Sequence, residues 1–167
     1  FANALEDMGV RREERIVLVL HDTVDFPTAF LGAIKAGVIP VPVNTLLTAK
    51  DYDFLLADTG AVALVVSAPL LDVLAPLIEA HRARLRLVVV SGGDARGHVS
   101  MDEALAGAHP RHVPAPTVGD DMCFWLYSSG STGTPKGAVH LHRSLMDTAR
   151  LYARPTLGIG PDDVVFS

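Results

Sequence analysis

The chain has 167 residues, enough for one compact domain with a substantial core or for part of a larger one. Its 49% hydrophobic and 20% charged residues are typical of a globular protein and exclude a disordered or fibrous one. The formal net charge of −5, with arginines interleaved among acidic and apolar residues, argues against a nucleic-acid-binding protein.

Cys123 is the single cysteine, so an internal disulfide and a disulfide-stabilised secreted fold are excluded. It lies in the apolar run Met122–Leu126, which predicts a buried, unreactive thiol. We find no signal-peptide pattern, and the apolar runs are too short to span a bilayer. We therefore expect a cytoplasmic protein that does not bind a membrane.

Phe1, Leu5 and Met8 have helical spacing, so we expect a helix at the start of the chain, before the first complete strand–helix unit. Ile16–Leu20 is a continuous aliphatic run, typical of a strand that is covered on both faces. Thr23 or Asp25 is expected to cap the next helix, which should end at Gly37.

Two prolines mark the next strand, Val38–Val43. Pro40 and Pro42 are two residues apart, so one side of this strand lacks N–H donors. We expect the strand to be short or to lie at the edge of a sheet.

The same alternation continues through the middle of the chain. Thr48 and Asp51 have the spacing of a capping box, which predicts a helix that ends at Gly60. The further elements expected are strands at Ala63–Ser67 and Leu85–Val90, a helix from Pro69, a short helix capped by Ser100, and a proline-rich loop over His109–Asp121.

Strands that alternate with helices imply right-handed βαβ crossovers. We therefore predict an α/β fold, a layered αβα arrangement with a mainly parallel sheet. The chain begins within helical spacing and stops in the apolar run Val164–Ser167, which we expect to be a strand. Residues 1–167 are accordingly expected to be a fragment of a larger domain.

The segment Ser128-Ser-Gly-Ser-Thr-Gly-Thr-Pro-Lys-Gly137 follows the apolar strand Met122–Tyr127 and contains no apolar residue except Pro135. Its glycines, Gly137 included, permit positive φ and close approach of a ligand, and successive amides can form a concave anion site. Lys136, one of three lysines in the chain, adds a point charge suited to phosphate. The predicted phosphate-binding residues are Ser128, Ser129, Gly130, Ser131, Thr132, Gly133, Thr134 and Lys136.

Two other structures fit this segment less well. A Walker A loop requires a lysine followed by Ser or Thr and then a helix, whereas Gly137 and the strand-like Ala138–Leu141 follow Lys136. A Ser/Gly hairpin turn without a ligand does not explain why Pro-Lys-Gly stands directly before a strand. A phosphate-binding loop between two strands is favoured over both.

Tyr127–Gly137 resembles the signature loop of the adenylate-forming superfamily, which includes acyl- and aryl-CoA ligases, adenylation domains and luciferases. Phe30–Asn44 and Leu46–Ala68 resemble two further stretches of that superfamily in the same order. The segments Asp22–Pro27 and Phe124–Gly130 look most like those of benzoate-CoA ligases.

The resemblance implies a ligase that activates a carboxylic acid, benzoate or a related aryl acid, with ATP and Mg²⁺. An acyl-adenylate and pyrophosphate form first, and coenzyme A then displaces AMP to give the thioester. The resemblance places the eight loop residues on the ATP phosphates and 1–167 in the N-terminal domain. The catalytic residues beyond this loop, and the C-terminal domain, are expected outside the chain. Alternatives are an adenylation domain that loads a carrier protein, a fatty acyl-CoA synthetase, and a non-catalytic nucleotide-binding module.

His140 and His142 would share one face if both lay on a strand. No third ligand accompanies them, so we expect no metal site and assign both a structural or pocket-lining role. The expected partners are the acid, ATP and CoA, and a homodimer stays open as an alternative.

Overall fold

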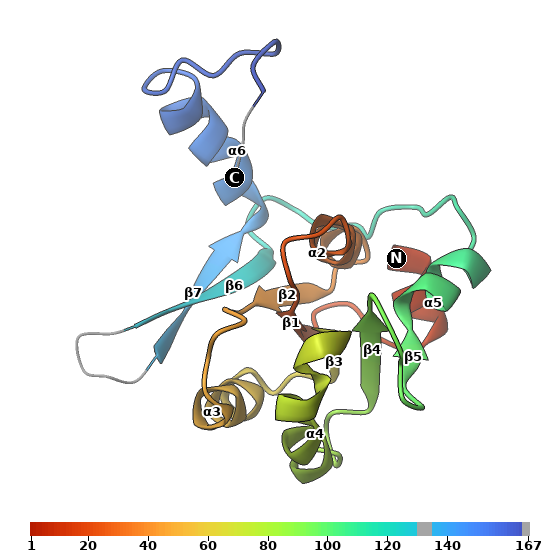
Figure 1. The fold of residues 1–167 in the computed structure, drawn as a ribbon. Coiled ribbons are helices and arrows are strands. Elements are labelled where there is room, and N and C mark those ends of the chain that lie inside the picture. Colours follow the sequence, from red (N-terminus) through yellow and green to blue (C-terminus); the bar gives the residue numbers. More distant parts are fainter. Residues whose placement is uncertain (130–134, 165–167) are drawn as a thin grey trace.

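The computed structural model describes residues 1–129 and 135–164 (Figure 1). Its main sheet has the order β2-β1-β3-β4-β5, and every neighbouring pair is parallel. The strands are β1 (Arg15–Val19), β2 (Ile39–Pro42), β3 (Ala63–Ser67), β4 (Leu87–Ser91) and β5 (Val99–Ser100). The predicted α/β class with a mainly parallel sheet is confirmed.

Helices cover both faces of this sheet, which explains its continuous apolar strands. Ile16 and Leu18 of β1 pack on the side of the first group of helices, and Val17 and Val19 pack on the opposite side. The first group is α1 (Ala2–Asp7), α2 (Asp25–Lys35) and α5 (Met101–Gly107); the second is α3 (Ala49–Thr59) and α4 (Leu71–Ala80), which follows the 3₁₀ turn η1 (Ala68–Leu70).

β2 is four residues long and lies at the edge of the sheet, as its two prolines predict. Amides on one side of residues 39–43 point toward β1: the Ile39 N–H donates to the Glu14 carbonyl at 2.9 Å, and the N–H of Val43, directly after β2, donates to the Leu18 carbonyl at 3.0 Å. Pro40 and Pro42 therefore occupy the positions whose nitrogens face away from β1.

Helix ends agree with their local signals, with one exception. Thr48 forms the expected capping box with Asp51, Gly60 ends α3 at φ 58°, and the Ser100 hydroxyl accepts from the Glu103 amide at 3.4 Å. For α2 the N-cap position is Val24 and not Thr23 or Asp25. The Thr23 hydroxyl, one residue earlier, still accepts from the Asp25 amide at 3.3 Å, whereas the Asp25 carboxylate accepts from the Ser91 hydroxyl at 2.5 Å.

The second part of the chain forms the antiparallel hairpin β6 (Met122–Ser129) and β7 (Pro135–Leu141), followed by α6 (His142–Thr148) and the π-helical turn η2 (Ala149–Ala153). This helical end leads away from the main sheet (Figure 1). Val164 lies in no strand and is 96% exposed, so the strand expected there does not include it; residues 165–167 of that prediction lie outside the described part of the chain.

Cys123 is buried as predicted, and burial raises the pKa of its thiol to about 11. None of the helices within residues 1–129 and 135–164 is long and apolar enough to cross a bilayer.

Candidate phosphate-binding hairpin

The predicted loop is carried by a hairpin, which confirms the strand–loop–strand order expected from the sequence. In its register, Tyr127 pairs with Gly137, and Ser128 with Lys136. The two strands thereby place both ends of the predicted phosphate loop at one end of a two-stranded ribbon.

Two of the eight predicted residues are brought together at this end. Ser128 and Lys136 are directly opposite each other and both are exposed. A hydroxyl donor and an ammonium group on paired positions suit a phosphate oxygen. Ser129 extends β6 opposite Pro135. Gly130, Ser131, Thr132, Gly133 and Thr134 lie outside the described residues, and their assignment stays a prediction.

Gly137 corrects one detail of the sequence analysis. Its φ is not among the positive values of the described glycines, so positive φ is not what this position requires. The requirement is space: a Cβ on Gly137 would lie 3.0 Å from Cζ of Tyr127 and 3.2 Å from its hydroxyl oxygen. The glycine lets the Tyr127 ring lie across the neighbouring strand.

A pocket of about 280 Å³ lies beside the loop end of the hairpin. The side chains of Asn44 and Asp51, its two polar residues from the α3 region, already accept hydrogen bonds from the Leu46 amide and from Thr48. The lining is Pro42, Val43, Asn44, Leu47, Asp51, Leu55, Tyr127, Ser128 and Pro135. The end of β2, helix α3 and the hairpin thus enclose one space.

One face of β6 packs on the main domain through aromatic residues. Trp125 and Tyr127, two residues apart, pack against the core cluster on the α3 side of the sheet. The Arg15 guanidinium lies 5.7 Å from the Trp125 ring centroid, while its Nε donates to the Thr59 carbonyl at 2.8 Å. A cation–π contact therefore joins the hairpin to β1 and α3.

Nearer the loop, the Tyr127 hydroxyl donates to Oδ2 of Asp58 at 2.5 Å. Asp58 belongs to the last turn of α3, 69 residues away along the chain. Burial, and then the adjacent Asp58 carboxylate, raise the pKa of Tyr127 far above its usual range. The hydroxyl consequently stays protonated and remains a donor.

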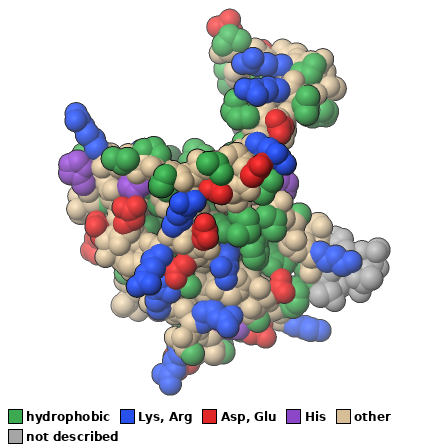
Figure 2. Space-filling view, turned by 180° about the vertical axis from the view of Figure 1, so that it is seen from behind, with side chains coloured by type: hydrophobic (Ala, Val, Ile, Leu, Met, Phe, Trp, Pro, Cys, Tyr) green, Lys and Arg blue, Asp and Glu red, His purple; other side chains and the backbone are tan. Residues whose placement is uncertain are grey.

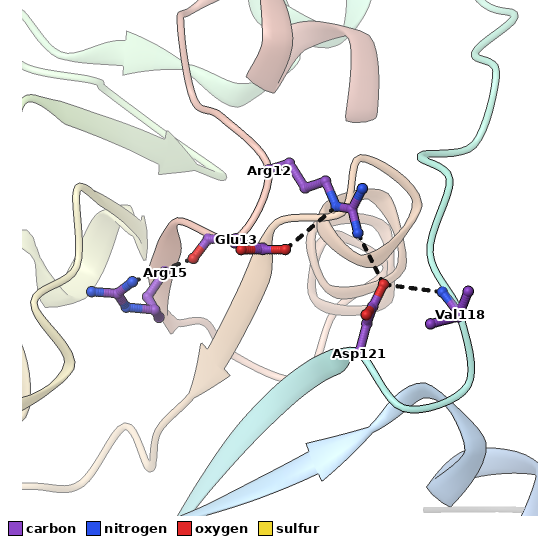
Figure 3. A network of polar contacts seen from close by, with 5 residues as sticks. All are labelled: Arg12, Glu13, Arg15, Val118 and Asp121. Atoms are coloured by element: carbon purple, nitrogen blue, oxygen red, sulfur yellow. Dashed lines mark hydrogen bonds and ion pairs between the residues drawn. The ribbon is translucent and has the colours of Figure 1, made fainter.

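A third attachment lies at the other end of β6 (Figure 3). Asp121, directly before β6, accepts from Nη2 of Arg12 at 2.9 Å and from the Val118 amide at 3.0 Å. Arg12 also lies 3.7 Å from the Glu13 carboxylate. The segment before β1 thus holds the start of the hairpin.

The histidines do not share a strand face as expected, because β7 ends at Leu141 and His142 begins α6. The His140 ring stacks on Phe124 at 4.6 Å, and Phe124 meets Phe30 edge-to-face at 5.3 Å, which assigns His140 a packing role. Within residues 1–129 and 135–164, no group of three His, Cys, Asp or Glu side chains could hold a metal ion.

The family profile described as "AMP-binding enzyme" matches residues 1–167. The chain belongs to the AMP-binding enzyme family. It is 49% identical over 160 residues to a benzoate–CoA ligase of Thauera aromatica, covering 96% of this chain and 30% of that protein.

Two solved structures of CoA ligases have the same fold over nearly all of this chain. A benzoate CoA ligase from Burkholderia xenovorans LB400 matches with a TM-score of 0.87 and 43% identity over 99% of this chain and 32% of that one. An anthranilate CoA ligase in complex with anthranoyl-AMP matches with a TM-score of 0.90 and 34% identity over 95% and 30%. The chain thus spans about 30% of the length of these relatives.

Two stretches that resembled the family lie side by side in space. Phe30–Asn44 forms the end of α2 and strand β2, and β2 runs along β6, the strand that leads into the signature loop (Figure 1). Asp58 and Arg15, which hold the hairpin, were missed by the sequence analysis. Neither stands in a recognisable motif with its aromatic partner, and only the fold brings the partners together.

Proposed function

We propose that this chain is part of the N-terminal domain of an enzyme that activates an aryl acid, benzoate or a close relative, and converts it to its CoA thioester. The observation that carries this proposal is the Ser128–Lys136 pair at the loop end of a hairpin in an AMP-binding enzyme. The 49% identity to a benzoate–CoA ligase supports the aryl acid and CoA.

The proposed reaction has two steps. A carboxylate oxygen of the acid attacks the α-phosphorus of ATP, the bond to the bridging oxygen breaks, and pyrophosphate leaves. The thiolate of CoA then attacks the acyl carbon, the bond to the phosphate oxygen breaks, and AMP leaves with the electron pair. The anthranoyl-AMP complex of a relative supports an acyl-adenylate intermediate.

In this proposal the loop holds the phosphates that leave as pyrophosphate. Lys136 offsets the negative charge that develops on them, and hydroxyl and amide donors fix their orientation in line with the attack. The assignment includes Ser128, Ser129, Gly130, Ser131, Thr132, Gly133 and Thr134 together with Lys136.

Four finer statements belong to the same proposal. We assign the enzyme to the cytoplasm and to the degradation of aromatic acids, and we keep the homodimer as an alternative to a monomer. Mg²⁺ is expected to enter with ATP. The described residues offer no carboxylate cluster for it, so no step is assigned to a metal held by this chain.

Pyrophosphate release by the full-length protein tests the proposal. We expect release that requires both benzoate and ATP, and benzoyl-CoA as product once CoA is added. If no aryl acid causes pyrophosphate release, the assignment of an aryl acid as the substrate is wrong. Acyl transfer only to a carrier protein, and not to free CoA, would favour an adenylation domain. ATP binding without release for any acid would favour a non-catalytic module.

A further inference from the structure

We infer that the Tyr127–Asp58 hydrogen bond positions the phosphate-binding hairpin, so that Tyr127 and Asp58 are positioning residues for ATP binding. This inference rests on the proposed function of the loop. It concerns two residues that do not themselves contact phosphate in the proposal.

The place of the contact along the hairpin is the first reason. Tyr127 stands one residue before Ser128, and its partner in the register, Gly137, stands one residue after Lys136. The hydrogen bond thus attaches the hairpin to the main domain one residue before the Ser128–Lys136 pair at which the loop begins. The contacts of Trp125 and Asp121 lie progressively farther from the loop.

The flexibility of the ribbon is the second reason. Two-stranded ribbons twist more than larger sheets and are marginally stable alone. The β6–β7 pair is a separate sheet with no ladder to β2, although the two strands are neighbours. Side-chain contacts must therefore set the angle at which the ribbon presents its loop.

The design of the contact is the third reason. A Cβ at Gly137 would crowd the Tyr127 ring, at 3.0 Å from its Cζ, and the hydroxyl of this ring reaches a carboxylate at 2.5 Å. Hydrogen bonds to charged groups are stronger than neutral ones. Asp58 stands on α3, whose Tyr52, Leu55 and Leu56 are buried in the core, so it is a fixed point of attachment.

The consequence is a specific dependence of phosphate binding on a contact outside the loop. Misplacement of a binding group by about 1 Å can reduce a rate by roughly a hundredfold. Tyr127→Phe keeps the ring and its packing but removes the donor. Asp58→Ala removes the acceptor, whereas Asp58→Asn keeps an oxygen that can accept.

The test measures the Kd of Mg·ATP by calorimetry on the full-length protein, without any acid. We expect Tyr127→Phe and Asp58→Ala each to raise the Kd about tenfold, and the double variant to be no worse than either single variant. Asp58→Asn, which keeps a neutral and therefore weaker acceptor, should raise the Kd less than Asp58→Ala does. Tyr152→Phe, an exposed tyrosine of η2, is the matched control.

A second measurement separates positioning from general loss of structure. In steady-state assays the KM for benzoate should stay constant while kcat/KM for ATP falls about tenfold. A lowered Tm with an unchanged Kd for Mg·ATP would make the contact merely structural and overturn the inference. Additive effects of the two variants would also overturn it.

The two proposals can fail separately. If the wild type binds Mg·ATP but releases no pyrophosphate with aryl acids, the proposed function fails while the calorimetric test still decides the positioning role. If the wild type releases pyrophosphate and Tyr127→Phe is unchanged, only the positioning role fails. A wild type that does not bind ATP contradicts both.

Discussion

The main sheet and the hairpin are held by different means. In the sheet, Ile16, Leu18 and Leu64 are completely buried, and helices cover both faces. In the hairpin, Leu126 and Val139 are 40% and 49% exposed, and hydrophobic side chains gather over the surface where the hairpin meets the sheet domain (Figure 2). The sheet is buried on both faces, whereas the hairpin buries only some of its side chains, Cys123 and Phe124 among them, and depends in addition on a few polar and aromatic contacts.

This difference matters for function because the predicted phosphate loop belongs to the hairpin. Binding elements commonly lie in the less stable parts of a domain, supported by a rigid scaffold. Here the scaffold is the sheet with α3, and the supports are Arg12, Arg15 and Asp58. The comparison predicts that mutations in the sheet change stability, whereas mutations in the hairpin change ATP binding.

The largest expected effect is on stability. Leu64→Ala, on the central strand β3, should lower the free energy of unfolding by about 2–5 kcal/mol, because it leaves a cavity in the core. Leu126→Ala, the matched change in the hairpin, should cost less than about 1 kcal/mol. Denaturant unfolding of the full-length protein measures both. Equal losses of unfolding free energy in the two variants would contradict this difference between sheet and hairpin, and would show that Leu126 is buried in the full-length protein.

The next effect is on rate. Lys136→Ala should lower the rate of pyrophosphate release by about a hundredfold, because a charge that stabilises the leaving phosphates is lost. The Tm should not change, since Lys136 is exposed. Lys35→Ala, an exposed lysine in the last turn of α2, is the control. An unchanged rate in Lys136→Ala would contradict the assignment of the loop.

Gly137→Ala should weaken Mg·ATP binding by about tenfold, because the new Cβ meets the Tyr127 ring and strains the ribbon. In a Tyr127→Ala background the same substitution should add little, since the ring is gone. Gly107→Ala, where no atom lies within 4 Å of the new Cβ, should leave binding unchanged. Equal effects in both backgrounds would show that Gly137 acts for another reason.

The smallest effect is expected at the exposed ion pair. Arg12→Ala removes a pair whose side chains are 40% and 30% exposed, so the loss should be about 0.2–1 kcal/mol and smaller in high salt. Denaturant unfolding at two salt concentrations measures it. A loss that is insensitive to salt would mean that the pair is shielded from solvent in the full-length protein.

The local parts of this structure follow from local signals. The capping box of Thr48, the end of α3 at Gly60 and the edge position of β2 are each determined within a few residues, and each was predicted. The hairpin followed from apolar segments on both sides of the loop. The two-residue strand β5 gave no usable pattern, because two residues are too few to show periodicity.

The contacts that hold the hairpin could not be predicted in the same way. Tyr127 and Asp58 are 69 residues apart, and Arg12 and Asp121 are 109 apart, so their proximity depends on the strand order. Gly137 shows a related limit. Its lack of a side chain was recognised, but the reason, a ring on the neighbouring strand, requires the register of the hairpin.

The two prolines of β2 also determine where the parallel sheet ends and the β6–β7 hairpin begins. The amides of Ile39 and of Val43, directly after β2, donate toward β1, whereas Pro40 and Pro42 leave the outer side of the strand, toward β6, without donors. A strand edge that offers acceptors but no donors is a poor template for pairing with another strand. The prolines thus keep the hairpin out of the parallel sheet, so side-chain packing and no backbone ladder joins β6 to β2.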